Sequence, residues 1–156
     1  MALPVDYIVS SLPALSFGAP APLSWERFAE AVGGAEAAEK LTAAFADIDT
    51  QLRNAAAEAR VGNAGCSRPA EGCSLYWRNR VAACFAEKDV ARRDELLDRA
   101  WWDAAGELVP PAAPLGKGAL AAYALRLRIA LRRDRISAKA GTAAFDRLTA
   151  ETRTTF

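Results

Sequence analysis

The chain has 156 residues, enough for one domain with a core of its own. Its 20 Lys and Arg nearly balance its 19 Asp and Glu, so no overall field draws it toward nucleic acid or acidic lipid. It contains no histidine, which excludes His-based acid–base catalysis, Ser–His and Cys–His nucleophile pairs, and most zinc and haem sites.

The first segment, residues 1–23, is predicted to form an extended N-terminal arm. Val5 to Val9 is a short run rich in β-branched residues, and prolines, which oppose helix formation, recur through the segment at Pro4, Pro13, Pro20 and Pro22. No Lys or Arg precedes the apolar stretch, so the layout of a secretory signal is missing. The chain has no run of about 18 apolar residues, so no membrane-spanning helix is predicted.

Residues 24–156 are predicted to form a helical domain, which makes the fold all-α, a bundle of about six to seven helices. Ser24, Asp89 and Ser137 are typical N-cap residues, while Gly33-Gly34 and Gly62 are typical helix ends. The helices are expected at about 25–32, 36–60, 74–87, 90–107 and 117–135, with a last one after Ser137. Their core stripes are Leu41, Phe45, Ile48 and Leu52; Trp77, Val81, Cys84 and Phe85; and Leu97, Trp101, Ala104 and Leu108.

The predicted helix 117–135 is apolar on two sides. One stripe consists of Leu120, Tyr123, Ala124, Leu127 and Leu131, and a nearly opposite one of Leu125, Ile129 and Ile136. A helix of this kind is usually packed on both sides. We therefore expect it to lie either within its own bundle or between the bundle and a partner.

Five arginines of this helix are the first candidate for partner binding: Arg126, Arg128, Arg132, Arg133 and Arg135. They would suit an anionic partner such as a phosphate, a lipid head group or an acidic protein. The alternative is that their stems cover apolar surface while their guanidinium groups pair with acids of the same chain. No nucleic-acid-binding motif accompanies them.

Trp102 is the second candidate, because it falls on the charged side of helix 90–107, opposite Trp101. An exposed Trp there would mark an interface. The alternative is that a neighbouring helix or the Pro-rich loop 109–114 covers it.

The acids of the same helix, Asp98, Asp103 and Glu107, could serve acid–base or metal chemistry, but we expect a solvated charged face. The glycines near Lys117 do not have phosphate-loop spacing and indicate a helix terminus. The three cysteines, Cys66, Cys73 and Cys84, match no zinc template. We expect reduced thiols, with Cys84 on an apolar helix face; a Cys66–Cys73 disulfide is the alternative. No catalytic residue, cofactor or metal is predicted.

Several segments together resemble a bacterial family encoded alongside the components of V-type (A/V-type) ATPases. The opening YIVSSLPALSF of residues 7–17 is similar to the start of that family, and DIDTQLRNA of residues 47–55 is similar to its helix centred on Leu-Arg-Asn. ELLDRAWWD of residues 95–103 resembles a later helix of the family. LAAYALRLRI of residues 120–129, with Ala140-Gly141 and Phe145, resembles the long helix that follows and its end.

The C-terminal arrangement is also similar to the C-type stalk component of V/A-type ATPases, called d in eukaryotes. That resemblance implies an all-helical, non-catalytic protein that seats the central stalk on the membrane rotor ring. Its implied partners are the other proteins of the ATPase, and its implied location is cytoplasmic, at the membrane only through the complex. The chain is about half the size of that component, so its full three-fold funnel cannot be present.

These observations leave three classes of function. The leading hypothesis is a non-catalytic, C-like stalk component of a V-type ATPase or ATP synthase that takes part in proton or sodium transport. The alternative is a generic helical interaction module that binds an anionic partner through Arg126–Arg135. An enzyme would have to work through carboxylates or a lone cysteine.

Overall fold

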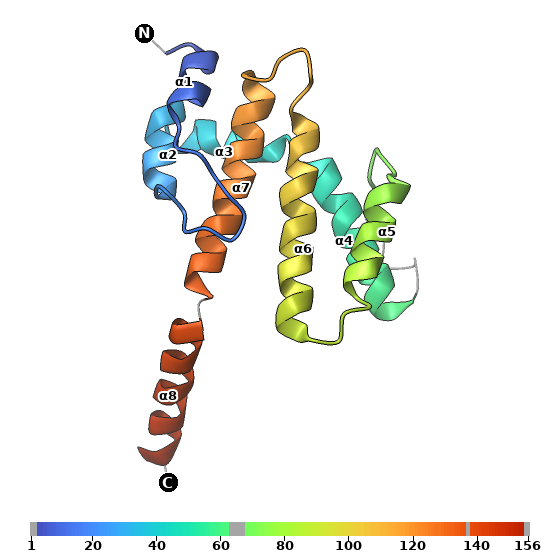
Figure 1. Ribbon diagram of the computed structural model, residues 1–156, viewed down its shortest axis with the longest axis vertical. Coiled ribbons are helices and arrows are strands. Elements are labelled where there is room, and N and C mark those ends of the chain that lie inside the picture. The colour runs from blue at the N-terminus through green and yellow to red at the C-terminus, as the bar shows by residue number, and fades with distance from the viewer. Residues whose placement is uncertain (1–2, 63–67, 137, 155–156) are drawn as a thin grey trace.

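The computed structural model describes residues 3–62, 68–136 and 138–154, and no strand occurs in these ranges (Figure 1). The all-α prediction is therefore confirmed. The helices are α1 (Val5–Ser11), α2 (Trp25–Val32), α3 (Ala35–Ala43), α4 (Ala46–Val61), α5 (Leu75–Cys84), α6 (Val90–Ala104), the 3₁₀ helix η2 (Ala105–Leu108), α7 (Lys117–Arg135) and α8 (Ala138–Thr154).

Most predicted helix ends are confirmed by their capping groups. The Ser24 hydroxyl accepts a hydrogen bond from the Arg27 N–H at the start of α2, and Asp89 accepts from two backbone N–H groups at the start of α6. Gly33 and Gly62 end α2 and α4 with left-handed φ angles of 107° and 69°, a conformation that favours glycine. The expected cap Ser137 lies outside the described residues.

The prediction of an extended arm is wrong for residues 5–11, which form α1. The fixed φ of Pro4 suits the position before a helix, and its carbonyl accepts the first helical hydrogen bond from Ile8 at 3.1 Å. Ile8 is buried and α1 contacts α7, so burial overrides the weak β preference of the segment. Residues 12–24 follow without regular structure.

The predicted helix 36–60 is also wrong in one respect, because it is two helices. At the break, the N–H groups of Ala44 and Phe45 bond to carbonyls only three residues back, so the last turn of α3 is tightened. Leu41 and Phe45, expected on one stripe, pack into two different cores on either side of this break. The chain therefore turns at Ala44 to serve both cores.

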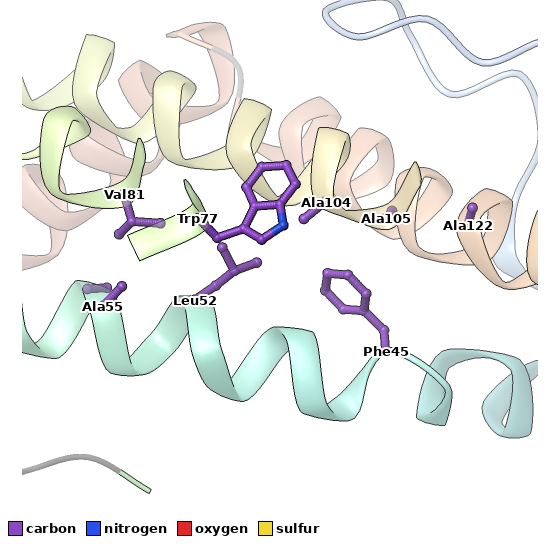
Figure 2. Close-up of a cluster of buried hydrophobic side chains, with 9 residues drawn as sticks. Phe45, Leu52, Ala55, Trp77, Val81, Ala104, Ala105 and Ala122 are labelled. Carbon is purple, nitrogen blue, oxygen red and sulfur yellow. The ribbon is translucent and has the colours of Figure 1, made fainter. Parts of the chain in front are cut away.

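Core 1 lies between α4, α5, α6, η2 and α7. Leu52 of α4 and Trp77 of α5 point toward each other, and Phe45 lies below the helix that carries Ala104 and Ala105 (Figure 2). Its buried members are Phe45, Leu52, Ala55, Ala56, Trp77, Val81, Ala104, Ala105 and Ala122. The predicted stripe of Leu97, Trp101, Ala104 and Leu108 packs in or against it, which confirms that prediction.

Core 2 lies between α2, α3 and α7. Phe28 is at its centre, stacked on Tyr123 with 5.7 Å between the ring centroids. Leu12, Leu15 and Leu23 from the N-terminal segment pack against it. The segment is fastened further by the Tyr123 hydroxyl, which donates to the Pro13 carbonyl at 2.7 Å. Residues 3–24 thus cover α7 rather than standing apart from it.

Helix α7 belongs to both cores. Ala122 is a member of core 1 and Leu125 packs against it, whereas Ala124 and Leu127 are members of core 2. The expectation that this helix packs on two sides is confirmed for its first three turns. At the other end Ile136 is exposed, and α8 extends from α7 away from both cores (Figure 1).

Gly118 allows α7 to approach η2 closely. A Cβ atom at this position would lie 1.8 Å from the carbonyl oxygen of Leu108. Backbone cannot give way as a flexible side chain can, so only glycine fits there.

We expect Gly118→Ala to lower the free energy of unfolding by about 2 kcal/mol or more, because the added methyl group overpacks a backbone contact. Urea denaturation followed by Trp fluorescence measures the change. Gly141→Ala in α8 is the matched control, since no atom lies within 4 Å of its Cβ position. Equal stability of the two variants would contradict the role given to Gly118.

Candidate functional site

A continuous groove runs between α4, α6 and α7. Its middle part has a volume of about 830 Å³, and two parts of about 460 Å³ adjoin it, one toward α3 and one toward Phe85. The middle part and the part toward α3 share Asp49, Arg53, Trp101 and Ile129. The middle part and the part toward Phe85 share Arg60, Asp94 and Leu97. We treat the three as one groove.

Each helix gives the groove one face with helical spacing. Helix α4 contributes Asp49, Arg53, Ala57 and Arg60; α6 contributes Asp94, Leu97 and Trp101; and α7 contributes Leu125, Ile129 and Arg132. Residues three, four and seven positions apart share a face of a helix, so each of the three helices turns one face toward the same space.

The floor of the groove is apolar and the walls are charged. Leu97, Trp101, Leu125 and Ile129 are half-buried there. The Trp101 indole N–H donates to the Asp49 carboxylate at 2.8 Å, and Arg53 donates to the same carboxylate at 2.7 Å. These two bonds fix the indole, so it presents a rigid flat surface to the groove.

One end of the groove carries excess positive charge. Among the described residues, Arg60, Arg68 and Arg93 have no carboxylate within 4 Å, and Asp94 has no cationic partner. Arg60 and Arg93 both lie over the ring of Phe85, at 5.4 and 5.7 Å from its centroid. Two cations, Arg60 and Arg93, and one carboxylate, Asp94, therefore line this end. Arg68 lines the middle part of the groove, where its backbone is hydrogen-bonded to the Asn54 side chain.

The predicted arginine set of α7 is mostly held by groups of the same chain. Arg128 pairs with Glu39 at 2.6 Å, and Arg132 and Arg133 both pair with Asp98. Arg126 donates to the Trp102 carbonyl at 3.0 Å, and burial lowers the pKa of its guanidinium. The alternative of internal pairing is confirmed for three of the five. Arg135 is exposed, and no partner for it occurs in residues 3–62, 68–136 and 138–154.

The expectation of a solvated acidic face is wrong for Asp98, whereas Asp103 is half-buried and Glu107 is exposed. Asp98 is only 8% exposed and lies under two arginines. Asp103 accepts from Arg80 of α5, and Glu107 accepts from the Trp77 indole N–H. These acids join α6 and η2 to α5 and α7, because ion pairs that are partly removed from water hold better than exposed ones.

Trp102 is buried, with 7% of its surface exposed, so an outward-facing role is wrong and the alternative that neighbours cover it is confirmed. Phe17 of the N-terminal segment meets its ring edge-on at 5.5 Å, and Arg126 of α7 lies 5.6 Å from the ring centroid. Both contacts come from residues far away in the sequence. The pattern of α6 alone could not reveal them.

The cysteines are apart from the groove. Cys84 is buried on the core face of α5, as predicted, and burial raises the pKa of its thiol. Cys73 is exposed, and Cys66, with the proposed Cys66–Cys73 disulfide, lies outside the described residues. No three Cys, Asp or Glu side chains in the described part of the chain are close enough to hold a metal ion.

No known protein family, curated protein or solved structure matches the chain. Among the described helices, none has both the length and the apolar character needed to cross a membrane.

We expect Trp102→Ala to lower the free energy of unfolding by about 3–5 kcal/mol, since it leaves a cavity between Phe17, α6 and α7. Phe145→Ala is the control, because Phe145 is an aromatic side chain that is 67% exposed, and its change should stay within about 0.5 kcal/mol. Chemical denaturation with an unchanged m-value checks both. A Trp102→Ala protein as stable as the control would contradict the burial argument.

We expect Asp98→Asn to lower the free energy of unfolding by about 1–3 kcal/mol, because it removes the charge that Arg132 and Arg133 share. Glu36→Gln breaks an exposed pair with Lys40 and should cost about 0.5 kcal/mol or less. Thermal and urea unfolding of both variants gives the comparison. Similar losses would show that the Asp98 pairs contribute no more than surface pairs.

Proposed function

We propose that this chain is a non-catalytic, protein-binding component of a V-type ATPase or ATP synthase. In this proposal it acts as the C-type stalk component does, linking the central stalk to the membrane rotor ring during proton or sodium transport. Its partners are the other proteins of the complex, and it reaches the membrane only through them. The complex is proposed on the resemblance of residues 7–17, 47–55, 95–103 and 120–129 to that family.

The observation that carries the protein-binding role is the groove between α4, α6 and α7. Three helices turn apolar and charged faces toward a space that no other part of the described chain fills. The groove is wide and open, with a fixed indole on its floor, which suits a protein segment better than a small substrate. Two of its carboxylates, Asp49 and Asp98, are already engaged by arginines.

A body with two cores that share α7 supports a mechanical role. Core 1 and core 2 pack on opposite sides of one helix, so movement of one core requires movement of the other. A protein that passes torque between its neighbours needs such stiffness.

The alternative, an anion-binding module that uses Arg126–Arg135, has less support. Four of those five arginines are engaged within the chain, and a guanidinium that already holds a carboxylate or carbonyl has fewer donors for a ligand.

A pull-down tests the proposed function. The tagged chain is expressed in its source cells, membranes are extracted in mild detergent, and co-purifying proteins are identified by mass spectrometry. We expect proteins of a V-type ATPase, and their complete absence would overturn the proposal. Ala57→Trp, which fills the groove, should reduce their recovery about tenfold. Ala82→Trp on the exposed side of α5 is the matched control and should leave recovery unchanged.

A further inference from the structure

The shape of the groove indicates a helical occupant. Its length along α4, from Asp49 to Arg60, is about 16 Å, or three helical turns. Ala56 and Ala57 lie between Arg53 and Arg60, so the wall is low there and a second backbone can approach closely. A fourth helix laid on the apolar floor would complete a bundle with α4, α6 and α7.

The charges of the groove indicate what flanks that helix. Arg53 and Arg132 are engaged by Asp49 and Asp98. Arg60 and Arg93 at the Phe85 end, and Arg68 in the middle part, have no carboxylate of the described chain within 4 Å. Burying these cations against a neutral helix would cost desolvation free energy, and no opposite charge would offset that cost. Acids on the flanks of the occupant would pair with them, and Arg is well suited to two-pronged carboxylate contacts.

Helix α8 of a second copy is a poorer occupant, although its Phe145 and Leu148 are exposed. Its sequence carries Lys139, Arg147 and Arg153 against only Asp146 and Glu151, so its charge has the same sign as the open end of the groove. Like charges brought together at an interface disfavour the pair.

We infer that the groove binds an amphipathic α-helix of a partner protein, with apolar residues on Trp101 and Ile129 and with Glu or Asp toward Arg60, Arg68 and Arg93. This inference takes the identity of the complex from the proposed function. The shape and charge of the groove, from which the partner helix is argued, do not depend on that identity. The acids are expected at the end of the partner helix nearest Phe85 and along its middle, because Arg60 and Arg93 line the Phe85 end of the groove and Arg68 lines its middle part.

Site-specific cross-linking tests the inference in the assembled complex. A photoreactive phenylalanine analogue replaces Ala57 on the groove wall or, as the control, Ala82 outside it. After irradiation and proteolysis, mass spectrometry identifies the segment joined to each position. We expect position 57 to cross-link to a helical segment with an apolar stripe and a net negative charge, and position 82 to give no such product.

Charge reversal tests the acidic flank. We expect Arg68→Glu to reduce recovery of the cross-linked partner about tenfold, because it places like charges together. It leaves the contacts of Phe85 untouched, unlike changes at Arg60 or Arg93. Arg135→Glu is the matched control on an exposed arginine outside the groove, and it should leave recovery unchanged; an unchanged melting temperature shows that both variants fold.

The outcomes separate the two proposals. If ATPase proteins co-purify but position 57 cross-links to none of them, or only to a basic segment, the inference is overturned and the proposed function stands. A cross-link to residues 138–154 of a second copy also overturns the inference. A cross-link to an acidic helix of a protein outside the ATPase supports the inference and counts against the proposed complex.

Discussion

The structure depends on the burial of α7 from two sides. Its alanines and Gly118 let neighbouring backbones come close, so Ala122 can join core 1 while Ala124 joins core 2 only two residues later. Larger side chains at these positions would push one core away. The alanine-rich composition, which offers little apolar volume per residue, is thus used where close approach matters more than filling space.

This constraint explains which features the sequence could predict. Caps and stripes are local, so Ser24, Asp89, Gly33 and Gly62 marked helix ends correctly. The break at Ala44 was not predictable from helical periodicity, because Leu41 and Phe45 remain in phase across it. The break is required only because the chain has two cores. The two cores arise from contacts between distant segments of the folded chain, which helical periodicity does not report. The same holds for α1, whose helix is stabilised by packing on α7 against a weak local preference.

The charged residues show a second limit. The sequence placed five arginines on α7 and three acids on α6 but could not pair them, since the partners Arg132 and Asp98 are 34 positions apart. Once these pairs form, the α7 arginines serve the fold more than a ligand. The groove arginines that pair with no carboxylate of the described chain come from α4, α6 and residue 68, where no local cluster drew attention to them. A spacing signal did exist, because Arg60 follows Arg53 by seven positions, about two helical turns, with alanines between them. Only the assembled helices show that this face meets Trp101 and Ile129.

The groove and α8 both adjoin the C-terminal half of α7. Ile129 and Arg132 face the groove, whereas Ile136 is exposed where α7 ends and α8 leads away. A partner helix seated in the groove would therefore contact α7 through Ile129 and Arg132. Because α7 is also the element that both cores share, a load applied in the groove reaches the whole body through one helix. That arrangement is what the proposed protein-binding role requires.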